Sequence, residues 1–504
     1  MQRVGGKNPI NLTKDSNVDN MQPAFSPDGR RIAFRSERDG GGIFIMGATG
    51  EDVRRLTDFG YNPAWSPDGN ELVCSTAWFP FANSRLSNNQ SQLYRINVST
   101  GEKRLVRTNR ADAVQAHWSP HGQRLAFWGL REGNRDIWTV PASGGQAIPV
   151  TNDAAIDWNP VWSPDGKYLY FSSDRAGTMN LWRVPIDEIS GKLLGTLEPV
   201  TTPSLDSGFM SFSPDGKRLL YVQQTFTWST FKVAFDPSRE TIVGQPLLMP
   251  DGLQRSDLSP DGRWLAFFRL DRKQEDIFII GSDGKGLRQL TDDIYKDRQP
   301  RWSPDGKTIA FFSNRGGNYQ VWTIHPDGSG LAQLTFEPSG DVSNPVWSPD
   351  GARLVYHIAD VNSFIIDRNK PWAPQSRQVL PRPSGLNGYL LVNSWSPDGR
   401  QLAGDMHQLS GSAGIGVYSL ESRQIRSVTQ MGRNPRWLRD SRRLLFVHSD
   451  KFYLADTQSG RVREILAMAP REAILAVPSP DDRWIYLNFQ VTEADVWQMS
   501  LGHD

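Results

Sequence analysis

Trp302-Ser303-Pro304-Asp305-Gly306 is the stretch that decides the fold of this chain. Proline fixes φ near −65° at the second position of a turn, Asp bonds to nearby backbone, and Gly accepts the positive φ that closes the turn. A short apolar run, Ile309-Ala310-Phe311, follows. An aromatic residue before the turn and a strand-like run after it predict a β-hairpin.

The tetrapeptide Ser-Pro-Asp-Gly of this turn recurs along the whole chain. Near copies at Ser119–Gly122 and Ser479–Asp482, with a worn copy at Leu438–Ser441, bring the total to eleven units. Successive units lie between 40 residues (Ser26 to Ser66) and 53 residues (Ser66 to Ser119) apart. No unit shows a helical apolar rhythm, so this period predicts an all-β chain of β-propeller blades with four strands each. The complete copies are Ser26–Gly29, Ser66–Gly69, Ser163–Gly166, Ser213–Gly216, Ser259–Gly262, Ser303–Gly306, Ser348–Gly351 and Ser396–Gly399.

The two chain ends break the order of four strands. Pro9–Thr13 reads as an isolated fourth strand, and the last unit stops after a third strand at Asp495–Met499. We expect the N-terminal strand to complete the last blade and seal its edge; a gene boundary that cuts through a repeat is the alternative.

Eleven blades exceed the four to eight that suit one ring. The sequence therefore predicts two tandem propellers, with about five blades in residues 1–250 and about six in residues 251–504. The most irregular joint, Phe235–Leu253, sets this division. A division one blade earlier, near Thr201–Ser207, is nearly as good.

The composition is that of an ordinary soluble globular protein, with 38% hydrophobic and 22% charged residues. A net charge of +1 argues against nucleic acid or an anionic membrane as the main partner. No run approaches the ~18 apolar residues of a membrane span. The N-terminus has no apolar signal-peptide core, so the chain is cytoplasmic or part of something longer. The single cysteine, Cys74, reads as a buried strand residue.

The search for catalytic motifs predicts no enzyme, cofactor or metal site. The sequence has no Gly-x-Ser-x-Gly nucleophile elbow and no phosphate-binding glycine loop. Among seven histidines only His117 and His121 have metal-ligand spacing, and they flank Trp118 and a turn. The repeated turn aspartates lie on separate blades, so we expect them to cap turns and not to share a calcium ion.

Arginines recur in the loops that join the second and third strands of a blade. Arg38, Arg175 and Arg315 occupy this place, and all three are candidate partner-binding residues. Either they form salt bridges between blades, or they line a charged rim on the face opposite the aspartate turns. Tyr295, in a loop between two blades, is placed on the same face of the second ring.

One of these loops is enlarged. Residues Ala77–Gln92 contain the aromatic residues Trp78, Phe79 and Phe81, which are costly to leave in water. They either fold over the propeller face or contact a partner, so they are candidate partner-binding residues as well.

A longer pattern surrounds the turn. Residues Arg298–Thr335 combine Trp-Ser-Pro-Asp-Gly-Lys-Thr-Ile-Ala-Phe, Ser-Asn-Arg-Gly-Gly and Asp-Gly-Ser-Gly-Leu-Ala-Gln-Leu-Thr. This pattern resembles the TolB-type WD40-like (PD40) propeller repeat. The resemblance covers the whole chain and is weakest at Val361–Pro383 and Met431–Leu466. It looks most like the C-terminal propeller regions of bacterial Ser/Thr kinases and winged-helix regulators, and it is specific for fold but poorly specific for function.

The resemblance implies a TolB-like, non-enzymatic binding or scaffold propeller that recognises a protein, peptide or glycan through its loop face. We expect a monomer without nucleic-acid partners, periplasmic by resemblance, with a cytoplasmic location as the alternative. Two further hypotheses stay open. The chain is the sensor region of a larger regulator, or it is a propeller-class lyase or hydrolase with a site in the central channel.

Overall fold

The computed structural model describes residues 10–501, except 17, 78–90, 111, 132–133, 202–205, 272–273, 339, 359–361, 384–387, 409–410 and 469–470. The chain forms two compact units. Unit 1 is Met1–Gln224 with Ala494–Asp504, and unit 2 is Thr225–Glu493. Two strands, β18 (Arg218–Asp236) and β41 (Trp484–Ser500), each contribute residues to both units.

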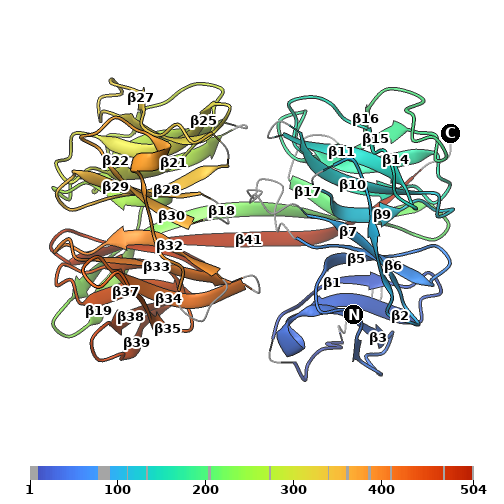
Figure 1. Ribbon diagram of the computed structural model, residues 1–504, viewed down its shortest axis with the longest axis horizontal. Coiled ribbons are helices and arrows are strands. Elements are labelled where there is room, and N and C mark those ends of the chain that lie inside the picture. Colours follow the sequence, from blue (N-terminus) through green and yellow to red (C-terminus); the bar gives the residue numbers. More distant parts are fainter. Residues whose placement is uncertain are drawn as a thin grey trace. The chain divides into compact units, whose positions relative to one another are not determined.

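Unit 1 contains four antiparallel sheets whose four strands follow one another in the sequence (Figure 1). The first two sheets are β1 (Asn20–Phe25), β2 (Arg31–Ser36), β3 (Gly42–Gly47), β4 (Arg54–Arg55) and β5 (Tyr61–Trp65), β6 (Glu71–Ser75), β7 (Leu93–Asn97), β8 (Lys103–Val106). The next two are β9 (Val114–Trp118), β10 (Arg124–Arg131), β11 (Asn134–Pro141), β12 (Ile148–Pro149) and β13 (Asp157–Trp162), β14 (Tyr168–Ser173), β15 (Asn180–Pro185), β16 (Glu198–Pro199).

Unit 2 contains five sheets of the same kind. They begin with β20 (Gln254–Leu258), β21 (Trp264–Asp271), β22 (Gln274–Gly281), β23 (Arg288–Gln289) and β24 (Asp297–Trp302), β25 (Ile309–Gly316), β26 (Asn318–Ile324), β27 (Ala332–Gln333). The third is β28 (Val342–Trp347), β29 (Arg353–Ile358), β30 (Asn362–Asp367), β31 (Gln378–Val379). The last two are β32 (Gly388–Trp395), β33 (Gln401–Gln408), β34 (Gly411–Ser419), β35 (Ile425–Thr429) and β36 (Arg433–Trp437), β37 (Arg443–His448), β38 (Lys451–Asp456), β39 (Val462–Ala467).

The remaining sheet joins strands that are distant in the sequence. Its order is β17 (Asp206–Phe212), β18, β41 and β40 (Glu472–Pro478), with β19 (Thr241–Leu248) paired to β18. In unit 2 the blade reads β40, first half of β41, second half of β18, β19. In unit 1 it reads β17, first half of β18, second half of β41. The expected all-β propeller of four-stranded blades is confirmed.

The Ser-Pro-Asp-Gly turns have the geometry that their residues predict. Ser303 Oγ donates to Asp305 Oδ1 (2.6 Å) and accepts from Thr308 N–H (3.0 Å). Asp305 Oδ1 also accepts from Lys307 N–H (3.1 Å), and Gly306 has φ +69°. The serine and aspartate thus satisfy the backbone where strand direction reverses, which confirms the capping role.

Neighbouring sheets pack through the aromatic residue before each turn. Trp302 is 7% exposed and lies in one cluster with Phe311 of its own sheet and Ala266 of the preceding sheet. Each such buried side chain contributes about 1.5–3 kcal/mol of transfer free energy. The repeated Trp-Ser-Pro-Asp-Gly string therefore encodes both the hairpin and the contact between blades.

The inner strands of unit 2 form a closed ring. Each of β20, β24, β28, β32, β36 and β40 contacts the next, and β40 contacts β20. Asn488 in β41 fastens the closing blade, because it accepts hydrogen bonds from the Ser256 backbone (3.1 Å) and donates to Thr230 Oγ1 (2.7 Å). In unit 1 the contacts run in order through β1, β5, β9, β13 and β17.

The N-terminal segment differs from the expectation. Ile10–Thr13 is not a strand, and Pro9 lies outside the described residues. Leu12 packs against Phe34 and Phe44 of the first sheet, so this segment does not complete the last blade. That blade is completed by β18 and β19, which come from the middle of the chain.

The division between the units also lies elsewhere than at residues 250/251. It falls after Gln224, because β18 runs without a break from Arg218 to Asp236. The irregular joint Phe235–Leu253 contains β19, which pairs with β18 in the same sheet. The loss of the repeat signature there thus marks a shared sheet and not a linker.

Helical structure in the described part of the chain is limited to two 3-10 turns, η1 (Arg38–Gly40) and η2 (Pro374–Ser376). None of its helices has the length and apolar character needed to cross a membrane.

Candidate functional site

Every inner strand carries a β-bulge near the ring axis. In β24, Arg298 pairs with Phe312 and Arg301 with Ala310, so the bulged strand has one residue more than its partner. Gln299 in this bulge has φ +49°. Bulges re-aim side chains and are common next to functional sites. The bulge residues with a left-handed backbone are Gln22, Asn62, Gln115, Asn159 and Phe209 in unit 1, and Arg255, Gln299, Asn344 and Asn434 in unit 2.

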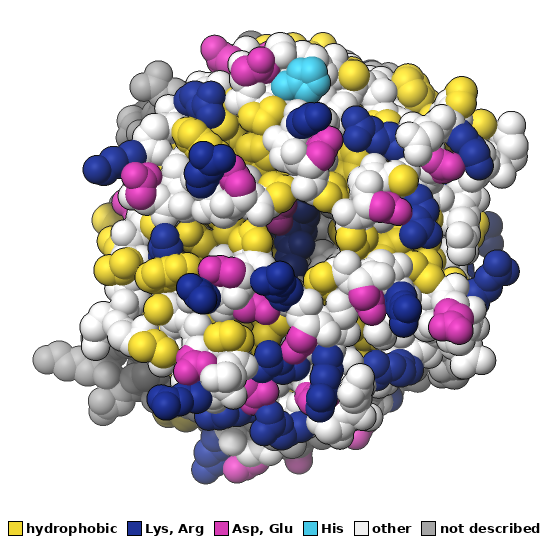
Figure 2. Space-filling view, turned by 90° about the vertical axis from the view of Figure 1, so that its left-hand side faces the viewer, with side chains coloured by type: hydrophobic (Ala, Val, Ile, Leu, Met, Phe, Trp, Pro, Cys, Tyr) yellow, Lys and Arg dark blue, Asp and Glu magenta, His cyan; other side chains and the backbone are white. Residues whose placement is uncertain are grey.

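The two rings differ in the charge of their inner strands. No Lys or Arg occurs in the five inner strands of unit 1. The six inner strands of unit 2 carry five arginines and no lysine. Figure 2 shows a face with a hollow in its middle, and basic side chains lie inside this hollow. We call Arg255, Arg298, Arg301, Arg433 and Arg436 the arginine cluster.

Three members of the arginine cluster have acidic partners. Arg298 forms an ion pair with the buried Glu275. Arg301 Nη1 lies 3.3 Å from Asp257 Oδ1. Arg433 pairs with Glu472 at 2.5 Å, where both side chains are about half exposed. A fourth, Arg436, donates from Nη1 to the backbone oxygen of Asn393 (2.9 Å).

Arg255 has no hydrogen bond or ion pair within the described part of the chain. Burial, and after it the charges of Arg433 and Arg301, lowers the pKa of its guanidinium to about 10. Asp405 is the acidic group that offsets this repulsion. Asp405 itself is buried, and burial raises the pKa of its carboxyl to about 7.

Two further arginines keep donor atoms without a partner. Arg301 is 6% exposed and Arg436 is 8% exposed. Nε of Arg301 and both Nε and Nη2 of Arg436 have no hydrogen bond within the described residues. A buried donor left unpaired costs about 1–3 kcal/mol, more when it is charged. The arginine cluster thus contains one guanidinium without a hydrogen bond or ion pair and several N–H groups without an acceptor among the described residues.

Sequence reasoning did not single out these arginines. Arg301 and Arg436 directly precede the tryptophan of the turn motif, and Arg298 and Arg433 lie three residues before them. Aligning the eleven units on the turn and comparing the positions before the tryptophan reveals arginines in unit 2 alone.

Arg175 and Arg315 make the same set of contacts in the two units. Arg175 binds Asp157 (2.9 Å), Asp153 (3.0 Å) and Ser173 Oγ (2.8 Å). Arg315 binds Asp297, Asp293 (2.6 Å) and Ser313 Oγ. Each arginine connects its own blade to the loop that enters it. These contacts favour the structural interpretation, a salt bridge.

The other candidate residues are Arg38, Tyr295, Trp78, Phe79 and Phe81. Arg38 donates to Ser16 Oγ (3.1 Å) and has no ion pair in the described structure. Tyr295 lies beneath the Arg315 guanidinium, 5.6 Å from ring centre to Cζ. Trp78, Phe79 and Phe81 lie outside the described residues. The role of all these side chains in partner binding stays a prediction.

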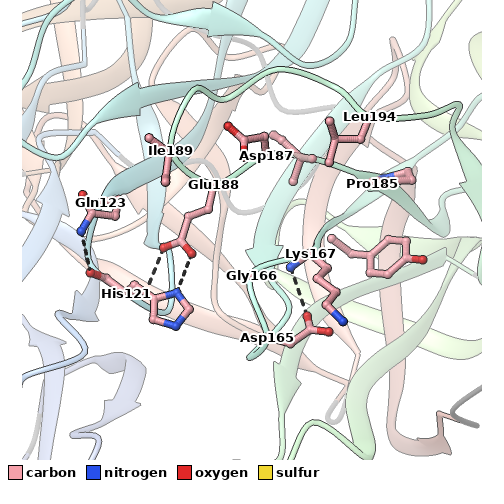
Figure 3. A pocket seen from close by; sticks show the side chains of 12 residues that line it. His121, Gln123, Asp165, Gly166, Lys167, Pro185, Asp187, Glu188, Ile189 and Leu194 are labelled. Carbon is pink, nitrogen blue, oxygen red and sulfur yellow. Dashed lines mark hydrogen bonds and ion pairs between the residues drawn. The ribbon is translucent and has the colours of Figure 1, made fainter.

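A pocket of about 700 Å³ lies at the turns of unit 1 (Figure 3). His121 occupies the place of the turn aspartate, and Glu188 from the next blade replaces the missing carboxylate. Glu188 Oε1 accepts from the His121 N–H (3.0 Å), and Oε2 lies 2.6 Å from His121 Nδ1. Burial opposes ionisation of Glu188, but hydrogen bonds from His121 and Ser119 hold its pKa below the usual value. Glu188 therefore takes over the turn-capping contacts at the edge of this pocket, which gives these two side chains a structural role.

Histidines do not gather into a metal centre in the described structure. Burial lowers the pKa of His117 to about 4. The rings of His357 and His407 both contact Tyr389, at centroid distances of 4.9 Å (tilted) and 5.1 Å (stacked). No group of three or more His, Cys, Asp or Glu that could hold a metal ion occurs within the described ranges.

Several curated proteins are similar to parts of this chain. An uncharacterized peptidase, YuxL, of Bacillus subtilis is 29% identical over 25% of this chain and 23% of its own length. A Tol-Pal system protein TolB of Anaeromyxobacter dehalogenans is 32% identical over 20% of each chain. An uncharacterized protein of Agrobacterium fabrum is 25% identical over 28% of this chain and 46% of its own. The chain thus spans less than half the length of these relatives.

Solved structures and a family model match longer parts of this chain than the curated relatives do. The tricorn protease covers 91% of this chain at 16% identity and a TM-score of 0.31, and TolB from Acinetobacter baumannii covers 71% at 15% and 0.29. The model of the TolB beta propeller domain, PD40, matches residues 62–245 and 211–382. Together these matches extend over more than half of the sequence, and the chain belongs to the PD40 family of TolB β-propeller domains.

Proposed function

We propose that this chain is a non-enzymatic binding protein that recognises a protein or peptide through the loop face of unit 2. The arginine cluster is the observation that carries this proposal. Arg255 has no partner among the described residues and lies in a largely buried place, where burial and neighbouring charges disfavour its charged form. Proteins keep such a local conflict mainly at functional sites.

The face formed by the Ser-Pro-Asp-Gly turns has fewer free polar groups for a ligand, because its aspartates already accept hydrogen bonds. Each complete turn aspartate accepts a hydrogen bond from its own serine and from a backbone N–H, as Asp305 does. In the loop between β23 and β24, by contrast, Ile294 is 82% exposed, next to Tyr295. An exposed apolar residue beside fixed charges fits a protein or peptide contact.

A periplasmic location and a TolB-like partnership with other proteins form part of this proposal, because Tol-Pal system proteins are among the relatives. Relatives named as peptidases support the alternative, a peptidase-associated propeller. The two alternatives differ in what happens to a bound peptide, which the binding protein releases intact.

Photo-cross-linking tests the proposal on two faces of one blade. A photoreactive phenylalanine analogue replaces Ile294 on the loop face or, as the matched control, the exposed Lys307 in the turn. In extract of the source organism, we expect a discrete cross-linked protein or peptide from position 294 and none from position 307. Equal products from both positions, or cleaved peptides released by the purified chain, contradict the proposal.

A further inference from the structure

We propose that the channel of unit 2 binds one carboxylate group of a peptide ligand, a chain terminus or an acidic side chain, at Arg255. The inference rests on the proposed binding function and adds the chemistry of the ligand. Its basis is geometric: three inner strands of one ring carry five arginines, basic side chains lie in the hollow of Figure 2, and Arg255 has no partner among the described residues.

The charges near Arg255 leave room for one anion. Asp257, Glu275 and Glu472 pair with other members of the cluster, and Asp341 acts on Arg298, whereas Asp405 is the acidic group that acts on Arg255. Because burial raises the pKa of Asp405 to about 7, its carboxyl is only partly ionised near neutral pH, and it offsets the charge of Arg255 only in part. A monoanionic carboxylate supplies one negative charge to Arg255, whereas a phosphate dianion brings a second negative charge next to Asp405.

Donor groups are also available for the oxygens of such a ligand. A guanidinium presents N–H groups in a planar fork that matches a carboxylate. Arg255 uses none of its donors within the described residues, and Nε of Arg301 in the same cluster is unused. The bound carboxylate thus replaces hydrogen bonds that the protein itself does not supply.

Unit 1 provides an internal comparison for this site. Its inner strands have the same bulges, but the residues there are amides such as Asn62 and Asn159. Asn159 is already bonded to Gln115 Nε2 (3.1 Å). The inner strands of unit 1 carry Asp157 and Asp206 but no arginine or lysine, so binding of an anion is expected in unit 2 alone.

Calorimetric titration of the full chain tests the proposal at low ionic strength, where screening is weak. The probes are N-acetyl-triglycine, its C-terminal amide, an acetylated and amidated Gly-Glu-Gly peptide, and inorganic phosphate. The variants are Arg255→Gln and, as a control, Arg400→Gln in an exposed turn of unit 2. We expect binding of at least one carboxylate peptide, no binding of the uncharged amide, and at least a tenfold loss in Arg255→Gln.

A second readout separates a ligand-binding role from a structural one. Without ligand, Arg255→Gln removes repulsion from Arg433 and Arg301, so its Tm should rise above that of the wild type, whereas the Tm of Arg400→Gln should not change. A lower Tm in Arg255→Gln assigns this arginine a structural role and overturns the proposal.

The remaining outcomes are also decisive. Equal affinities of the acid and the amide, equal losses in the two variants, or tighter binding of phosphate than of both carboxylate peptides refute a carboxylate site. If carboxylate binding fails while cross-linking at position 294 persists, the binding function stands without this ligand chemistry. If cross-linking fails while carboxylate peptides bind, the loop face and not the channel has been misassigned.

Discussion

Units 1 and 2 are built from the same hairpin, yet they present different chemistry at their centres. Both have a bulge in each inner strand. Both sets of inner strands carry amides at their bulges, but those of unit 1 have no arginine or lysine, whereas those of unit 2 carry the arginine cluster. The comparison shows that the repeat fixes where a side chain lies, while its identity decides what the channel can bind.

Trp302→Ala should have the largest effect on stability. Removing this buried indole from between two blades leaves a cavity, and we expect a loss of about 3–5 kcal/mol. Trp162→Ala is the matched change in unit 1, at 2% exposure. Calorimetry should show each substitution lowering a different unfolding transition. A loss below about 1 kcal/mol for Trp302→Ala contradicts the assigned role of this residue between blades.

Asn488→Ala breaks the closure of unit 2 specifically. It leaves the buried Ser256 N–H without its acceptor and removes the hydrogen bond that Thr230 Oγ1 accepts, for an expected cost of about 1–3 kcal/mol. Amide hydrogen exchange should accelerate in β20 and β40 and remain unchanged in β9. Equal acceleration of amide hydrogen exchange in both units contradicts a role of Asn488 in closing unit 2 alone.

Asp405→Asn sharpens the electrostatic difference between the units. Because burial raises the folded-state pKa of Asp405 to about 7, its ionisation destabilises the fold as pH rises from about 4 through 7. The facing groups are the Asn434 N–H, Asn393, Arg433 and Arg255, and an Asn side chain can still accept from Asn434. The variant should have a higher Tm than wild type at pH 8, and the difference in Tm should be smaller at pH 5. The opposite order at pH 8 means that the charge is needed to balance the arginines.

The smallest expected effect is a change in the reactivity of the Cys74 thiol, which lies in unit 1 and reports on the opening of that unit. Burial raises the pKa of the Cys74 thiol to about 12, so it should not react with a disulfide reagent at pH 8 in the native state. Trp162→Ala should accelerate the reaction and Trp302→Ala should not. Acceleration by Trp302→Ala indicates that the two units open together.

The sequence was sufficient for the hairpin, the four-strand blade and the total of eleven repeats, because these depend on local turn chemistry and strand patterns. It was not sufficient for the shared sheet, because β18 and β41 pair across more than two hundred residues and carry no turn motif at their crossing. The roles of Arg175 and Arg315 were left open in the same way, since their aspartate partners become visible only when the entering loop folds back. The arginine cluster could not be predicted either, because its members come from three separate blades and share a ring only through the register of β20, β24 and β36.

The order of β18 and β41 has a consequence for synthesis on the ribosome. Thr225–Glu493 is an insertion within unit 1, whose last sheet needs Ala494–Ser500. All of the insertion therefore leaves the ribosome before its host can be completed, and a nascent chain halted at residue 493 retains the inner ring of unit 2 while the outer edge of β17–β18 stays open. Premature termination near the C-terminus thus harms the part of the molecule that was translated first.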